Sequence, residues 1–147
     1  MSDEKTGTVP LVVHGNELSE NTAQTPAMHR RAAIHAESAG ASKIWMGWVT
    51  NAPGTDSGVH HHGEAETAAY VISGRVGVRF GEGFREYVEA GPGDFLFVPA
   101  WAPHIEVNPS TDEPSEVIVS RGPDNIVVNL GASPREVTRP DLSREDG

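Results

Sequence analysis

The sequence contains no cysteine, so neither a disulfide framework nor a thiolate metal site is available to the chain. It also lacks an apolar run approaching the roughly 20 residues that a membrane-spanning helix requires. Basic residues are few, because 11 Lys and Arg stand against 21 Asp and Glu, for a formal charge of −10. Phosphate backbones are bound by clustered Lys and Arg, and no such cluster is present. The sequence therefore argues against nucleic-acid binding and against a membrane span.

The length and the turn residues indicate one all-β domain. A chain of 147 residues is the size of a single domain and buries roughly two-thirds of its unfolded surface. Its 16 Gly and 11 Pro are spread singly, which is typical of turns between short strands. The N-terminal residues are polar and lack the apolar core of a signal peptide. We therefore expect a soluble, cytoplasmic, all-β protein.

The pattern along the chain predicts a flexible N-terminal tail (1–10), one domain (11–131) and a polar C-terminal tail (132–147). Residues 9–14 form a short candidate strand, and the segment 15–40 is poorly patterned, with 31–37 either a helical turn or an irregular strand. Further strands follow between Gly and Pro turns, which suggests a closed or nearly closed antiparallel barrel. In the first of these, Ile44, Met46 and Trp48 share one face. The predicted strands are 43–50, 68–72, 75–80, 84–90, 95–98, 104–108, 114–120 and 125–130.

Three consecutive histidines, His60, His61 and His62, follow a turn-rich segment. On an extended chain His60 and His62 point to one face and His61 to the other. Two imidazoles beside a carboxylate make half of a site for a divalent first-row metal. The second half is expected from His104, further along the chain.

These two segments resemble the two motifs of the cupin superfamily. The resemblance covers about residues 44–130 and implies a small jelly-roll β-barrel with a short irregular N-terminal segment, usually dimeric. Cupins include dioxygenases, decarboxylases, isomerases, lyases, sensor domains and storage proteins, so the fold leaves the reaction open. The residues that carry the resemblance are Gly58, His60, His62, Glu66, Tyr70 and Gly74 in the first motif, and Gly93, Pro99, His104 and Asn108 in the second.

The predicted metal ligands are His60, His62, Glu66 and His104, around one divalent ion (Fe, Mn, Ni, Cu or Zn). The family glutamate usually stands three residues before the motif tyrosine, a position that Thr67 occupies here. An unbroken strand would turn Thr67 inward and Glu66 outward, whereas a bulge or the turn at Gly63 would bring Glu66 inward. Both alternatives remain open.

Other residues near the motifs have more than one interpretation. Glu106 shares the face of His104 and is a candidate to orient a ligand histidine, to act as a general base, or to lie exposed at the rim. His61 is expected on the surface or in a dimer contact. Trp101 would line the barrel mouth or close it. The residues Met46, Trp48, Phe97 and Trp101 either line a substrate pocket or pack in the core.

We therefore expect a mononuclear metal-binding protein with one of two functions. The first is a metalloenzyme for a small oxygen-bearing organic substrate, either a dioxygenase-like oxidoreductase or an isomerase or lyase. The second is a ligand-binding or metal-binding module without turnover. A homodimer is implied by the resemblance, with residues 126–128 and the edge strands near the termini as the expected contact.

Overall fold

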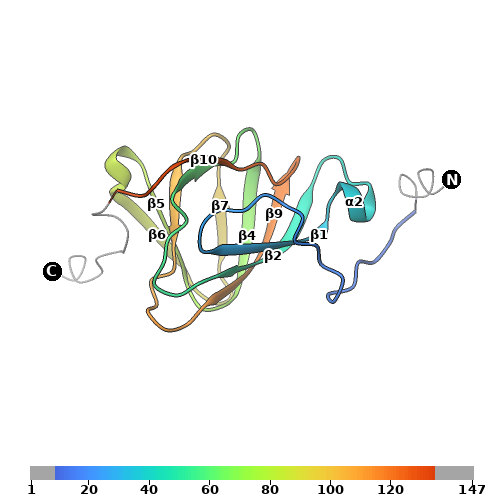
Figure 1. Ribbon diagram of the computed structural model, residues 1–147, viewed down its shortest axis with the longest axis horizontal. Coiled ribbons are helices and arrows are strands. Elements are labelled where there is room, and N and C mark those ends of the chain that lie inside the picture. Colours follow the sequence, from blue (N-terminus) through green and yellow to red (C-terminus); the bar gives the residue numbers. More distant parts are fainter. Residues whose placement is uncertain (1–8, 135–147) are drawn as a thin grey trace.

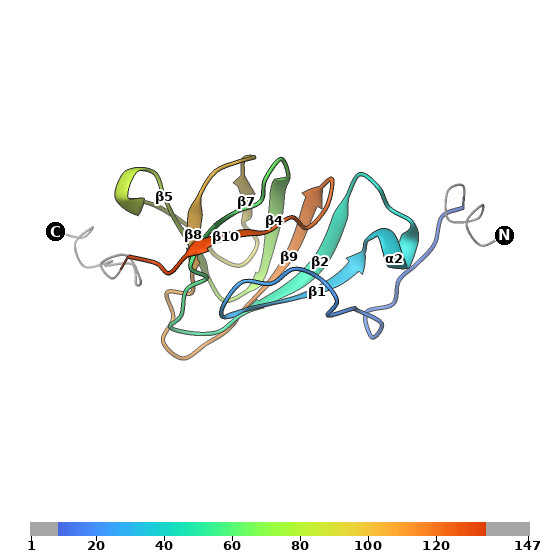
Figure 2. The same cartoon turned by 45° about the horizontal axis from the view of Figure 1, so that its top comes forward.

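The computed structural model describes residues 9–134. Most of the two predicted tails, 1–8 and 135–147, lies outside the described residues. Figures 1 and 2 show two β-sheets that face each other, with the short helix α2 (Ala36–Ala39) beyond one end of β1 and β2. None of the described helices has the length and apolar character needed to cross a membrane.

The first sheet carries the long strands of the molecule. All of its strand pairings are antiparallel. Its central strand comes from near the end of the domain and lies between strands from earlier parts of the chain. In spatial order the strands are β1 (Met28–Ile34), β2 (Trp45–Asn51), β9 (Ser115–Gly122), β4 (Glu66–Ser73) and β7 (Phe95–Val98).

The second sheet is built from shorter strands and carries the histidines. The 3-10 turn η1 (Glu82–Phe84) connects its last two strands. In spatial order they are β10 (Val128–Gly131), β3 (Val59–His61), β8 (His104–Val107), β5 (Val76–Phe80) and β6 (Glu86–Ala90).

The all-β jelly-roll prediction is confirmed, with one correction. The sheets do not close into a barrel, because within residues 9–134 the edge strands β6 and β7 each pair with one neighbour only and not with each other. The molecule is an open sandwich of two sheets, with one open side between β6 and β7 and, in the described part of the chain, a second pair of unjoined edges at β1 and β10.

Alternation along the strands places one face of each sheet in the interior. Val49, Val71 and Val117 are each no more than 4% exposed and come from β2, β4 and β9. The inward side chains of β5 and β8 complete this core, and half of the buried polar residues are histidine or arginine. The facing inner surfaces therefore bring the site residues together.

The inward face of β2 differs from the predicted one. Trp45 is 1% exposed and points inward, whereas Met46 is 42% exposed and lies on the outer face. Trp48, also on the outer face, donates a hydrogen bond to Glu116. The alternation was visible in the sequence, but both faces of this strand carry large apolar side chains, so composition did not indicate which face is buried.

The N-terminal segment also differs in part from expectation. Residues 9–14 form no strand in the described chain, and the poorly patterned segment contains β1. β1 ends at Ile34 and the helical turn α2 follows almost at once, so the ambiguous stretch 31–37 contains both elements.

Candidate metal centre

Strands β3 and β8 bring two histidines and one carboxylate to the inner face of the second sheet. His60 pairs directly with His104 across the two strands. Glu106 lies two residues after His104 and so shares its face. His62 follows the end of β3, just before a turn in which Gly63 has a φ of 57°. That left-handed conformation suits glycine, and it turns the chain back immediately after the histidine.

The three imidazoles form a compact buried group. His60, His62 and His104 are at most 2% exposed. Their ring centroids lie 4.3 Å (His60–His104), 4.8 Å (His60–His62) and 5.2 Å (His62–His104) apart. One ligand atom from each histidine and from Glu106 lies within 4.8 Å of all the others. Ligands at ~2.0–2.2 Å on opposite sides of one ion would lie about 4 Å apart, so this group is close to the size of a single metal site.

Backbone carbonyl groups fix the orientation of each imidazole. The Nδ1 atom of His62 lies 2.7 Å from the carbonyl oxygen of Ile126, and that of His104 lies 2.9 Å from the carbonyl oxygen of Ala102. Nδ1 of His60 lies 3.2 Å from the carbonyl oxygen of Gly58. Because a carbonyl oxygen only accepts, each Nδ1 donates its hydrogen, and each Nε2 keeps its lone pair. Such support is what ligand histidines ordinarily receive.

The Nε2 lone pairs of His60 and His104 face the carboxylate. Oε2 of Glu106 lies 3.6 Å from Nε2 of His60 and 3.4 Å from Nε2 of His104. Both Nε2 atoms are buried and have no hydrogen-bond partner among the described residues. Two nitrogen lone pairs and a carboxylate repel one another when they face each other at these distances. A cation between them would turn this repulsion into attraction. The donor set of three imidazoles and one carboxylate therefore fits a divalent first-row ion.

The electrostatics of the site favour neutral imidazoles at His60 and His62 and an ionised carboxylate at Glu106. Burial lowers the pKa of His60, and burial together with the charge of Arg121 lowers the pKa of His62 to about 2. Burial alone would raise the pKa of Glu106, but the neighbouring His104 and His60 imidazoles outweigh burial and hold that pKa well below the usual value. Neutral imidazoles and an ionised carboxylate are the protonation states in which these side chains bind metal.

Ser57 connects two members of the site. Its hydroxyl accepts a hydrogen bond from the backbone N–H of Glu106 at 2.9 Å and lies 3.3 Å from Nδ1 of His60. Its own backbone N–H donates to the carbonyl oxygen of Glu106 at 2.9 Å. Ser57 is completely buried, so it positions the carboxylate and the histidine relative to each other.

The structure does not bring Glu66 to the histidines. Glu66 is exposed at the start of β4, while the next residue, Thr67, is 3% exposed and points inward. β4 runs unbroken from Glu66 to Val71, and its register shift comes only after Val71. The register set by Tyr70 therefore holds, and Glu106 is the carboxylate at the cluster. The sequence indicated the inward direction of Glu106 only through its position two residues after His104.

Two interior arginines were missed by the sequence analysis. Arg121 is 2% exposed. Its Nε donates a hydrogen bond to the hydroxyl of Thr67, and its Nη1 donates one to Oδ1 of Asn125, each at 2.8 Å. Its Nη2 lies 3.2 Å from Nε2 of His62. Arg30 on β1 is fully buried. Arg121 stands one residue beyond the predicted strand 114–120. Because it lies two residues after Val119 and four after Val117, strand alternation in the sequence indicated that it points inward as they do.

Of the predicted pocket residues, Phe97 lies at a cavity and Met46 and Trp48 lie on the outer face of β2. Trp101 is 65% exposed, and its ring lies 5.7 Å from that of His61. It thus packs with the outward histidine and does not close the interior.

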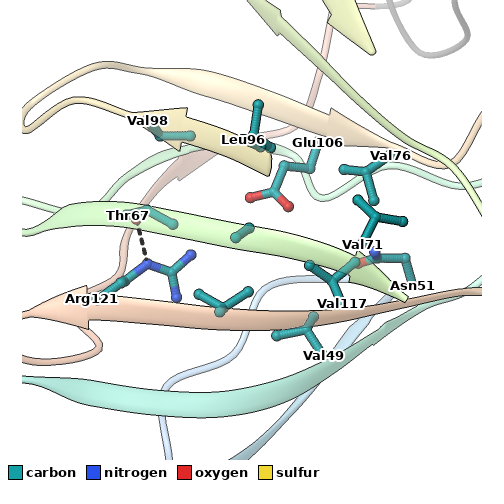
Figure 3. Close-up of a pocket in the computed structure, with 12 residues that line it drawn as sticks. Val49, Asn51, Thr67, Val71, Val76, Leu96, Val98, Glu106, Val117 and Arg121 are labelled. Carbon is teal, nitrogen blue, oxygen red and sulfur yellow. Dashed lines mark hydrogen bonds between the residues drawn. The ribbon is translucent and has the colours of Figure 1, made fainter. Parts of the chain in front are cut away.

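Two cavities meet at β7, and they share Leu96 and Val98 as wall residues. The interior cavity is small, about 20 Å³, and Figure 3 shows Glu106 and Arg121 pointing into it among valine side chains. The second cavity, about 230 Å³, has apolar walls and reaches His104; Val78, Val88 and Phe97 are among its lining residues.

Comparison with solved structures shows the same fold in proteins of low sequence identity. The polyketide cyclase RemF from Streptomyces resistomycificus is 22% identical, with a TM-score of 0.66 over 87% of this chain and 92% of that one. Oxalate decarboxylase from Bacillus subtilis is 23% identical, with a TM-score of 0.61 over 75% of this chain and only 29% of that one. KdgF from Halomonas sp. is 20% identical, with a TM-score of 0.59 over 78% and 94% of the two chains.

At the sequence level, no curated protein matches the chain. A family model described as "Cupin domain" matches residues 47–121, which is more than half of the 147 residues. The matched segment includes all three histidines, Glu106 and Arg121. The protein belongs to the cupin family.

Proposed function

We propose that the protein is a mononuclear metal-dependent lyase or isomerase that acts on a small organic substrate through the substrate's oxygen atoms. The observation that carries the proposal is the convergence of three buried Nε2 atoms and one carboxylate, with each imidazole oriented through its Nδ1. Neighbours of this fold include a polyketide cyclase and an oxalate decarboxylase, which supports non-oxidative chemistry. The Bacillus subtilis decarboxylase contains Mn(II) centres.

Each residue of the site has a defined role in this proposal. His60, His62, His104 and Glu106 would hold one divalent ion (Fe, Mn, Ni, Cu or Zn), and an ion bound there supplies a Lewis acid for substrate oxygens. Four ligands leave coordination positions open in a five- or six-coordinate ion. The valine-lined walls keep bulk water from the substrate, which strengthens charge interactions inside the site.

The proposal is tested by reconstituting the chelator-treated protein with each of the five ions and screening small hydroxy acids, keto acids and phenols. We expect product without oxygen uptake, lost on chelation and restored by one ion. Oxygen uptake with the iron form would assign the dioxygenase-like chemistry instead. Tight metal binding without turnover of any compound would assign the non-catalytic module.

A matched pair of variants separates the site from the rest of the protein. Glu106→Gln removes the negative ligand, and Glu66→Gln makes the same chemical change on the exposed outer face. We expect turnover to fall at least 100-fold in the first and to remain at the wild-type level in the second. Equal activity of the two variants would contradict the proposed site.

A further inference from the structure

Two guanidinium groups lie in the interior of the sandwich without a carboxylate partner. Arg30 is 0% exposed and Arg121 is 2% exposed, and within the described residues neither has a carboxylate oxygen within 4.0 Å. Arginine remains charged in proteins, and a buried charge without a paired anion costs several kcal/mol. Two such residues in one small core need a compensating function.

Arg30 has unused hydrogen-bond donors. Its Nε and Nη1 atoms are buried without a partner among residues 9–134, and its Nη2 has only a weak contact of 3.9 Å with the sulfur of Met28. The indole N–H of Trp45, on the inner face of the neighbouring strand β2, is also buried without a partner. The interior of the first sheet therefore offers more donors than the protein supplies acceptors.

Arg121 is held in place but keeps one donor for the site. Thr67 and Asn125 fix its Nε and Nη1, which leaves Nη2 directed at Nε2 of His62. A metal ion on His62 would use the lone pair that now accepts this hydrogen bond. Nη2 would then point beside the ion with no acceptor of its own, in a suitable place to bind an anion held at that ion.

The charge balance of the site also calls for an anion. Among the described residues that line the interior cavity, Glu106 is the only acid. Against it stand Arg121, which lines the same cavity, and Arg30, which lies outside the lining but is close enough for its charge to act on both Glu106 and Arg121. The three groups together carry one net positive charge, and three when a divalent ion is bound. An anionic ligand would neutralise part of this charge and accept the unused hydrogen bonds, and a carboxylate matches the planar fork of a guanidinium.

The sizes of the two cavities indicate how such a ligand would lie. The interior cavity of about 20 Å³ has room for little more than one water molecule, so it can take the charged end of a ligand but not a whole substrate. The adjoining cavity of about 230 Å³ is almost entirely apolar and begins at His104. An organic acid with an apolar body fits these two cavities, with its charged group in the smaller one and its apolar part in the larger one.

We propose that Arg121, assisted by the nearby charge of Arg30, forms an anion subsite that binds the carboxylate of a small organic acid, whose apolar part occupies the cavity next to His104. The inference deepens the proposed function, because it names the substrate class of the same site. It places the arginines opposite the metal ligands, so that the acid is bound between the two.

Benzoate and its neutral analogue benzamide are suitable probes, titrated calorimetrically into the full chain with and without bound metal. We expect benzoate to bind at least tenfold more tightly than benzamide. Arg30→Gln and Arg121→Gln should each weaken benzoate binding tenfold or more and leave benzamide binding unchanged. Arg85→Gln, on the exposed turn after η1, is the matched control and should bind benzoate as the wild type does.

Two further measurements keep the test decisive. Arg121→Lys retains the charge without the fork, so it should fold and show weakened benzoate binding even if Arg121→Gln does not fold. Formate and phosphate distinguish the organic acid from a free inorganic anion; phosphate binding more tightly than benzoate would overturn the assigned ligand. Equal affinity for benzoate and benzamide, or wild-type benzoate binding in both glutamine variants, would overturn the subsite.

The inference and the proposed function can fail separately. Arginine-dependent benzoate binding by a protein that takes up no metal would support the subsite and contradict the metalloenzyme. Metal-dependent turnover of a neutral substrate, unchanged in Arg30→Gln, would support the metalloenzyme and contradict the subsite.

Discussion

At the scale of single residues, the site depends on which nitrogen of each histidine faces inward. The backbone carbonyls of Gly58, Ala102 and Ile126 accept hydrogen bonds from the three Nδ1 atoms, so that Nε2 is the atom presented to the interior. Glu106 contacts the Nε2 atoms of His60 and His104 and not their Nδ1 atoms. It therefore stands where a fourth ligand would, and orienting the imidazoles is left to the backbone.

This placement gives a prediction for metal affinity. Glu106→Gln keeps the side-chain shape but removes the negative charge, so the metal Kd should rise by at least the roughly 10–100-fold that follows the loss of a supporting group, because a ligand itself is changed. Glu66→Gln should leave the Kd unchanged, because Glu66 is exposed outside the cluster. Competition titration with a chromophoric chelator measures both. A larger effect from Glu66→Gln would contradict the arrangement.

The lowered histidine pKa values give a prediction for stability against pH. The unfolded chain binds protons at His60 and His62 near pH 6.5, whereas burial keeps both neutral in the folded protein, with the pKa of His62 at about 2. Below pH 6.5 the unfolded state therefore binds more protons, and the free energy of unfolding falls as the pH falls. The slope is up to about 1.4 kcal/mol per pH unit for each histidine.

Urea denaturation of the metal-free protein at pH 7, 6 and 5 measures this slope. His62→Gln should reduce the slope by the contribution of one histidine, because the substituted side chain binds no proton in the unfolded chain. A free energy of unfolding that does not vary over this range would contradict the neutral state of the buried imidazoles.

Among single residues, the sequence predicted correctly those directions that depend only on the spacing of residues along a strand. His60 and His62 share a face because they are two residues apart on a strand, and the structure places both inside. Whether Glu66 or Thr67 faces inward depended on whether β4 contains a bulge, which is a property of its pairing with β9. The parity of Arg121 with Val117 and Val119 indicated its inward direction, but its contacts with Thr67 and His62 join segments far apart in the sequence, so no local pattern revealed them.

At the scale of elements, β2 shows how one glycine sets the inward face. A Cβ atom on Gly47 would lie 2.5 Å from Cη2 of Trp45 and 2.5 Å from the carbonyl oxygen of Arg31. The indole of Trp45 therefore occupies the space above Gly47, and the strand can bury a tryptophan only because the residue two positions later has no side chain.

Gly47→Ala should destabilise the protein by overpacking, at a cost of about 1–3 kcal/mol. For a domain of this size that corresponds to a fall in Tm of roughly 2–10 °C. Gly15→Ala is the control, because a Cβ there meets nothing within 4 Å. Thermal unfolding followed by circular dichroism measures both variants, and an unchanged Tm in Gly47→Ala would contradict the packing of Trp45.

At the scale of the whole molecule, the all-β jelly-roll class followed from the Gly and Pro turns and the cupin motifs. The open side between β6 and β7 did not, because closure depends on how the two edges meet and not on the composition of either strand. The second cavity lies along this open side, since its walls come from β5, β6, β7 and the chain before β8. An open edge thus gives a substrate access to His104.

The outer face of the first sheet carries large exposed apolar side chains, a pattern that marks association surfaces. Phe95 is 80% exposed, Phe97 59% and Tyr70 40%, and the rings of Tyr70 and Phe95 lie 4.9 Å apart. We propose a homodimer through this face; the contact expected from the sequence, around residues 126–128, lies elsewhere, next to and within the edge strand β10.

Phe95→Lys should shift the protein from dimer to monomer in sedimentation velocity, with its metal content unchanged. Val12→Lys, a similar change at an exposed position outside the sheets, should remain dimeric. A wild-type protein that sediments as a monomer, or a Phe95→Lys variant that stays dimeric, would contradict this surface as the interface.

The most direct test of the central claim is elemental analysis of the untagged protein, with metal counted per chain. We expect about one equivalent of a single divalent first-row ion in the wild type, and its loss in both His62→Ala and His104→Ala, each of which removes one of the converging Nε2 atoms. A wild type that contains no metal and takes none up on soaking, or a His104→Ala variant with undiminished metal content, would contradict the account.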